Sequence, residues 1–123
     1  MNWNFKNFSE KEFACQHCGK NGIEYEFVEK LQQLRDEFGK PIKINSGYRC
    51  PEHPIESAKK TTGTHCEGYA VDIAVDREDA YKLLGLALQL EFTGIGIKQK
   101  GDNRFIHLDT SKVKNPRPTI WSY

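Results

Sequence analysis

The sequence predicts an α+β fold, in which a small antiparallel sheet is flanked by helices. Two segments repeat apolar residues at steps of three and four, which is the period of an amphipathic helix: 25–38 and 77–90. Shorter segments have the apolar alternation or the glycines typical of strands: 41–45, 70–75, 92–97 and 104–108. The residues at 101–103 predict a turn that returns the last strand toward the one before it.

Each helical segment has residues that define its ends and its buried side. The segment 39–41 is expected to end the first helix, and Asp76 to cap the second. Before both, Ser9 and Glu12 have the spacing of a capping box for one helical turn. The expected buried side of the first helix carries Phe27, Val28, Leu31, Leu34 and Phe38. That of the second carries Ala80, Leu83, Leu84, Ala87 and Leu90.

Composition indicates one globular domain over residues 1–123, with 37% apolar and 28% charged residues. The 18 basic and 17 acidic residues are scattered and give a net charge of +1, which argues against nucleic-acid binding. No apolar run approaches the length of a membrane span, and the first residues lack the apolar core of a signal peptide. We expect a monomer that is made in the cytoplasm, without a signal peptide or membrane insertion.

A set of metal-ligand residues centres on the segment 63–73. His65 and Asp72, separated by six residues, offer an imidazole and a carboxylate, and both bind zinc well. Asp72 lies in an apolar run, where an unpaired carboxylate is costly and a metal is the simplest partner. His107, in a later strand, is best placed to supply the third ligand, and an open fourth position would complete a hydrolytic zinc site. The polar segment 51–64 before His65 is expected to be a loop or short helix, with turn residues Thr61, Thr62 and Gly63.

Several motifs together resemble one protein family. They are Ser46-Gly47-Tyr48-Arg49, Pro51-Glu52-His53, Thr64-His65-x-x-Gly68-x-Ala70-x-Asp72 and Phe105-Ile106-His107-Leu108-Asp109. In these motifs the chain is similar to the zinc D-alanyl-D-alanine carboxypeptidases, a family that includes peptidoglycan endopeptidases and phage endolysins and shares its fold with the Hedgehog signalling domain. The resemblance implies that His65, Asp72 and His107 bind zinc on one face of the sheet. It also implies that Arg49 contacts the substrate or the transition state, a role that suits its fork of donors.

The motifs leave the catalytic base open. Relatives carry Glu or Asp three residues before the last histidine, where this chain has Arg104. Because side chains alternate along a strand, His107 and Asp109 are expected to point to the same face. Asp109 is therefore expected either to act as the general base or to orient a histidine ligand. Glu67 and Asp102 are further candidates for the base without a geometric argument.

The four cysteines are Cys15, Cys18, Cys50 and Cys66. A cytoplasmic origin argues against a disulfide framework. Cys15-x2-Cys18 together with Cys50-x2-His53 has the ligand types and spacings of a structural zinc site, which would tie the N-terminal segment to the loop after the first strand. The alternatives are free thiols or one disulfide. Cys66 is not expected to be a ligand.

The C-terminal segment 115–123 contains Pro116 and Pro118. Since proline has no N–H and restricts the backbone, no regular structure is expected in this segment. Its last aromatic residues are expected to pack back on the body and to cover the core rather than to form the floor of the cleft: Trp121 and Tyr123.

From the residues and the resemblance together we expect a zinc metallopeptidase. Its reaction would be the hydrolysis of an amide bond in the peptidoglycan stem peptide or cross-link, either as a D-Ala-D-Ala carboxypeptidase-like enzyme or as a peptidoglycan endopeptidase. A phage-type lysin would reach the cell wall through a holin, or be delivered with the virion. One alternative is a non-catalytic zinc-containing binding module of the same fold, which the missing acid at Arg104 leaves open. Another is a metal-free interaction domain.

Overall fold

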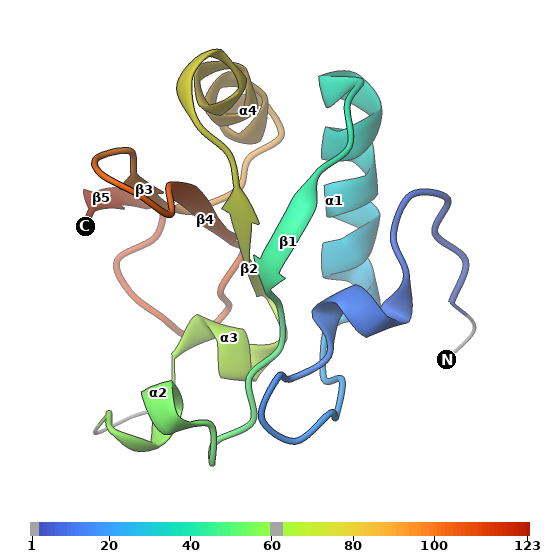
Figure 1. Cartoon of the computed structure of the whole chain (residues 1–123), viewed down its shortest axis with the longest axis vertical. Helices are drawn as coiled ribbons and strands as arrows, with labels where there is room; N and C mark the ends of the chain where they lie inside the picture. Colours follow the sequence, from blue (N-terminus) through green and yellow to red (C-terminus); the bar gives the residue numbers. More distant parts are fainter. Residues whose placement is uncertain (1–2, 60–62) are drawn as a thin grey trace.

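The computed structural model describes residues 3–59 and 63–123, so the predicted turn residues Thr61 and Thr62 lie outside the described residues. Within these residues, five strands form one mixed sheet in the order β1-β2-β4-β3-β5 (Figure 1). The strands are β1 (Lys43–Ser46), β2 (Ala70–Ala74), β3 (Gly94–Lys98), β4 (Phe105–Asp109) and β5 (Thr119–Ser122). The helices are the 3-10 helix η1 (Glu10–Phe13), α1 (Tyr25–Phe38), α2 (Pro54–Ser57), α3 (Thr64–Glu67) and α4 (Arg77–Gln89). The predicted α+β class is therefore confirmed.

The predicted helices form, but their caps differ from the prediction. α1 has the predicted bounds, and Gly39 after it adopts a left-handed backbone with φ 74°. Asp76 occupies the predicted N-cap position of α4, but its side chain makes no capping hydrogen bond and instead pairs with Arg77 Nη1 at 3.2 Å. The capping box is also wrong: the Ser9 side chain makes no cap, and the Glu12 N–H donates to the Ser9 backbone oxygen. Three residues expected to be buried lie partly exposed at the margin of the core: Phe38, Leu84 and Leu90.

The two faces of the sheet differ in chemistry, because side chains alternate along each strand. One face packs against α1 and α4 and contributes Ile73, Ile106 and Leu108 to the apolar core. Figure 1 shows these two helices beside the sheet, and the short helices α2 and α3 near the end where β1 stops and β2 begins. The other face carries Asp72 and His107, which β2 and β4 place directly opposite each other. The expected metal ligands therefore lie on the face away from the two long helices.

The C-terminal segment forms a strand, so the expectation that it has no regular structure is wrong. β5 pairs with β3 in parallel, which also makes the sheet mixed rather than purely antiparallel. The reason is the position of the prolines: Pro116 and Pro118 precede β5, and the residues after them keep their N–H groups. Thr119 donates its N–H to Thr93 O at 2.8 Å, and Tyr123 donates to Ile97 O at 3.1 Å.

No helix within the described residues has both the length and the apolar composition that crossing a bilayer requires.

Candidate metal centre and its cleft

Three short elements bring His65, Asp72 and His107 together. Asp72 on β2 and His107 on β4 are register partners in neighbouring antiparallel strands. His65 lies in α3, which ends at Gly68 with φ 84° before the chain enters β2. This turn folds the helix back over the start of β2, so the six intervening residues bring His65 beside Asp72.

The ligand atoms of these three residues converge on one point. His107 Nδ1 lies 3.1 Å from Asp72 Oδ1, and His65 Nε2 lies 3.4 Å from the same oxygen. One ligand atom from each residue lies within 4.8 Å of the others. The two histidines are buried, with relative exposures of 5% and 4%, and Asp72 is partly open to the cleft. The predicted set of ligands is thus assembled in one place.

The outer nitrogen of each histidine is held by an acceptor. His65 Nδ1 lies 2.7 Å from Gly47 O, and His107 Nε2 lies 2.7 Å from Asp109 Oδ2. A carbonyl or a carboxylate oxygen only accepts, so these two nitrogens carry the hydrogen atoms. In the neutral rings, the inner nitrogens then present lone pairs toward Asp72 Oδ1. Such an arrangement is repulsive until a proton or a metal cation lies between these atoms, so the residues fit a zinc ion, and the outer acceptors are the partners that zinc-bound histidines usually have.

The electrostatics of the centre favour positive charge. Burial would raise the pKa of Asp72, but hydrogen bonds with His107 and His65 hold it well below its ordinary value. Burial would lower the pKa of His107, yet its hydrogen bonds to Asp109 and Asp72 raise it above the ordinary value. A proton and a metal ion therefore compete for the same nitrogen, so metal affinity is expected to fall as the pH falls.

Asp109 is fully buried and its acceptor positions are taken. Oδ1 accepts from the Ser111 N–H at 3.1 Å and from Arg117 Nε at 3.0 Å. Oδ2 accepts from Arg117 Nη2 at 3.0 Å and from His107 Nε2 at 2.7 Å. These four donors occupy the four lone-pair directions of a carboxylate. With burial working against them, the hydrogen bonds to His107 and Arg117 keep the pKa of Asp109 below its ordinary value.

The other two carboxylates that the sequence offers as bases lie elsewhere. Glu67 accepts from Ser111 Oγ at 2.7 Å and from the Lys112 N–H at 3.1 Å. Asp102 is exposed on the turn between β3 and β4 and lines a different hollow, together with Val75 and other residues. Neither side chain lines the cleft that contains the candidate ligands.

The candidate ligands lie at one side of a cleft of about 530 Å³. Arg49 lines this cleft, as the sequence predicts. Trp121 and Tyr123 line it too, so the expectation that these aromatics cover the core is wrong. The reason is the pairing of β5 with β3: Trp121 lies over Gly96, where a Cβ would be 2.5 Å from its Nε1. The Trp121 ring then packs against His107, with 5.1 Å between ring centroids.

Glu56 is a buried partner of Arg49 that the sequence did not predict. It lies in a polar loop that looks like surface, but α2 turns its side chain inward until it is only 1% exposed. It accepts from Arg49 Nη1 at 3.1 Å, from Lys59 Nζ at 3.0 Å and from the Gly63 N–H at 2.8 Å. Burial would raise the pKa of Glu56, but these donors lower it to about 2.

Arg49 is therefore held on three sides. Its Nη1 pairs with Glu56, its Nε donates to Ser46 Oγ at 3.1 Å, and its Nη2 lies 3.4 Å from Asp72 Oδ2. Its guanidinium reaches the edge of the candidate metal centre in a fixed orientation. No feature of the local sequence predicts this anchoring, because Glu56 and Arg49 meet only through the fold of the loop.

The structure brings three of the four residues of the expected second site together. Cys15, Cys18 and Cys50 have sulfur atoms within 4.8 Å of one another. His53 is not part of this group, because its Nδ1 accepts the Ile55 N–H at 3.2 Å at the start of α2. Cys66 lies outside the group, as expected.

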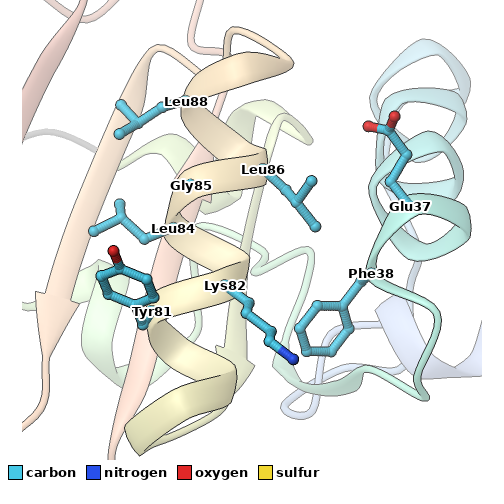
Figure 2. Close-up of a pocket in the computed structure, with 8 residues that line it drawn as sticks. All are labelled: Glu37, Phe38, Tyr81, Lys82, Leu84, Gly85, Leu86 and Leu88. Carbon is cyan, nitrogen blue, oxygen red and sulfur yellow. The ribbon is translucent and has the colours of Figure 1, made fainter.

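A separate hollow of about 620 Å³ lies between α4 and the C-terminal end of α1 (Figure 2). Figure 2 shows Phe38 and Leu86 pointing into the space between the two helices. Its lining is mainly apolar and includes no histidine or cysteine. It has neither the donors of a metal site nor a pair of catalytic groups, so the cleft around Asp72 is the candidate active site.

Replacing Gly94 with alanine is expected to weaken zinc binding by about 10–100-fold, the usual cost of disturbing a group that orients a histidine ligand. A Cβ at Gly94 would overlap the Asp109 carboxylate, which must then shift away from His107. The measurement is zinc affinity in competition with a chelator. Gly85→Ala is the matched control, since a Cβ at this position in α4 meets nothing within 4 Å. Equal zinc affinities in the two variants would contradict the prediction.

Two imidazoles and one carboxylate beside an open cleft are the ligand set of a hydrolytic zinc enzyme. The sequence profile of the peptidase M15 family matches residues 6–109, which is most of the chain. The protein therefore belongs to the peptidase M15 family, the zinc D-Ala-D-Ala carboxypeptidase-like peptidases, and is at this level a zinc metallopeptidase of peptidoglycan. The match ends at Asp109, so β5 and its aromatics lie beyond it. A comparison with curated proteins found no match.

Proposed function

We propose that this protein hydrolyses an amide bond in the stem peptide or cross-link of peptidoglycan and acts as a phage-type lysin. The observation that carries the proposal is the convergence of His65, Asp72 and His107 beside an open cleft, in a chain of a peptidase family. A zinc ion held by these residues supplies a Lewis acid that polarises a carbonyl and activates water. The cell wall would be reached through a holin or from the virion.

The charge of the cleft supports an acidic peptide as the substrate. Among the described residues that line it, Asp72 is the single carboxylate, and the basic residues are Arg49, Lys59, Lys114 and Arg117. Peptides of the cell wall carry free carboxylates, which this lining attracts. A second hollow shares Arg49 and Asp72 with the cleft and continues past Asn45, so an extended peptide can pass the candidate centre on both sides.

Each residue around the centre has a separate role in this proposal. Arg49, fixed by Glu56 and Ser46, binds a substrate carboxylate or the oxyanion that forms when the scissile carbonyl is attacked. Asp109 orients His107 and keeps the hydrogen on its Nε2, so that Nδ1 faces the ion. Trp121 and Tyr123 form an aromatic wall of the cleft.

Asp109→Asn separates the two roles that the sequence leaves open for Asp109. If Asp109 orients His107, removing its charge is expected to lower zinc affinity by about 10–100-fold. Activity should then recover in part at high zinc concentration. A general base would behave differently, since zinc affinity would stay at the native value while kcat fell at every zinc concentration. The measurement is a zinc titration of activity, with zinc affinity determined separately.

Digestion of purified peptidoglycan sacculi tests the function itself. Mass spectrometry of the released fragments is carried out with the native protein, with added chelator and with His107→Ala. Defined fragments that disappear in both controls are expected, and their masses name the bond that is cut. The proposal would be contradicted if folded, zinc-loaded protein released no fragments from the cell walls of several chemotypes.

A second candidate function is a non-catalytic zinc module that binds peptidoglycan. The favouring observation is that Asp72 is the single carboxylate among the described residues that line the cleft. Arg104, where relatives carry an acid, donates its Nε to Gly101 O at 2.9 Å on the neighbouring turn. This function predicts zinc-dependent pull-down of sacculi by the native protein without released fragments. A Tm that is the same with and without chelator would instead favour the metal-free interaction domain.

A further inference from the structure

Three cysteines from distant parts of the sequence meet outside the candidate active site. Cys15 and Cys18 follow η1, and Cys50 follows β1. Their sulfur atoms lie within 4.8 Å of one another, and all three are free thiols. Tetrahedral zinc with Zn–S bonds of about 2.3 Å holds its sulfur ligands about 3.8 Å apart. Only a small inward movement would be needed to accommodate such an ion.

The backbone positions these sulfur atoms with hydrogen bonds. Gly19 donates its N–H to Cys15 O at 2.8 Å, and Cys15 donates its N–H to Lys20 O at 2.7 Å, which closes a tight turn around Cys18. The Cys50 N–H donates to Cys15 Sγ at 3.3 Å and joins the two loops directly. An N–H directed at sulfur is a favourable partner for a metal-bound thiolate.

Apolar packing does not account for the group. Cys15 and Cys50 are buried, but Cys18 is exposed and its position gains nothing from burial. A disulfide would use two of the three thiols and leave the third beside it without a role. A metal ion is the one partner that engages all three.

We propose that Cys15, Cys18 and Cys50 bind a second, structural zinc ion that ties the N-terminal segment to the loop after β1. His17 and His53 lie in the same two loops, with ring centroids 6.1 Å apart, but neither joins the three sulfur atoms in this structure, so a fourth protein ligand would require one of these rings to move. This site is independent of the residues that carry the proposed hydrolysis.

The ion would stabilise the loop that supports the candidate active site. Gly47 in this loop accepts from His65 Nδ1, and Arg49 lines the cleft. The same loop is linked to the N-terminal segment by a hydrogen bond from the Tyr48 N–H to Phe13 O at 2.8 Å. Zinc at the three cysteines would add a second link beside this one.

Zinc content tests the proposal without any measurement of activity. Native protein purified with a phosphine reductant is expected to hold about two zinc ions per chain, and Cys18→Ser and His107→Ala about one each. Cys18 is exposed, so its serine variant opens no cavity. Cys66→Ser changes a thiol outside the group and, as the matched control, is expected to keep about two ions per chain.

A mercurial titration of the unaltered protein gives a second measurement that depends on no variant. Mercurials displace zinc from thiolates and not from histidine or carboxylate, so release of about one zinc ion per chain is expected. The proposal is overturned if native protein holds about one ion that only His107→Ala removes. It is equally overturned if thiol counting shows a disulfide among the three cysteines in protein purified without reductant.

Discussion

Asp72→Asn is expected to weaken zinc binding at the candidate active site strongly and, with it, hydrolysis of peptidoglycan. Asp72 Oδ1 is the atom that both inner histidine nitrogens face, at 3.1 Å and 3.4 Å. Asparagine keeps the size of the side chain but removes the charge that a divalent ion requires. Zinc affinity is expected to fall by more than about 100-fold, beyond the loss caused by disturbing an orienting partner. The specificity constant kcat/KM for hydrolysis is expected to fall by at least about 1,000-fold, because the metal stabilises the transition state by several kcal/mol.

Asp102→Asn is the matched control for this change. It makes the same substitution at an exposed carboxylate on the neighbouring turn, outside the cleft. Its activity and zinc affinity are expected to equal those of the native protein. The measurements are fragment release from sacculi, zinc affinity, and the rise of Tm on adding zinc, which should be present in the control and reduced in Asp72→Asn. Native activity in Asp72→Asn would remove Asp72 from the metal centre.

Glu56→Gln is expected to destabilise the fold by about 3 kcal/mol, since it leaves the mostly buried Arg49 without the closer of its two carboxylate partners. Glu56 is buried between Arg49 and Lys59, whose side chains are 13% and 42% exposed. For a chain of this size the loss corresponds to a fall in Tm of about 10 °C. Activity is expected to fall as well, because Arg49 loses the contact that holds its guanidinium at the cleft. Glu52→Gln, at an exposed position of the same loop, should leave stability unchanged.

The contribution of Glu56 depends on pH in a defined direction. Burial opposes its ionisation, but the Gly63 N–H, Lys59 and Arg49 lower its pKa from 4.5 to about 2. A folded-state pKa below the unfolded value stabilises the protein above pH 4.5, and this stabilisation is lost as the pH falls from 4.5 to about 2. Denaturant unfolding in the presence of chelator, at about pH 6 and about pH 3, measures it. The stability difference between native protein and Glu56→Gln should shrink at the lower pH; an equal difference at both would contradict the assignment.

Much of the fold and of the metal centre follows from the sequence alone, because the responsible signals are local. The apolar repeat of 25–38 and the stop at Gly39 give the observed bounds of α1. Strand alternation places His107 and Asp109 on one face, and the structure joins them by a hydrogen bond of 2.7 Å. His65 and Asp72 are close in the sequence, so a short helix and a turn suffice to bring them together.

Only the tertiary structure decided which groups support that centre. Glu56 becomes the buried partner of Arg49, and Arg117 fills the acceptors of Asp109, through contacts that no periodicity encodes. Trp121 enters the cleft because β5 pairs with β3, although the preceding prolines argue locally against a strand. The Arg49–Glu56 and Asp109–Arg117 contacts span only seven and eight residues and depend on the conformation of irregular loops, whereas the position of Trp121 depends on the pairing of β5 with β3. Residue type and spacing therefore predict the candidate metal ligands, whereas loop conformation and sheet pairing determine how those residues are held and what surrounds them.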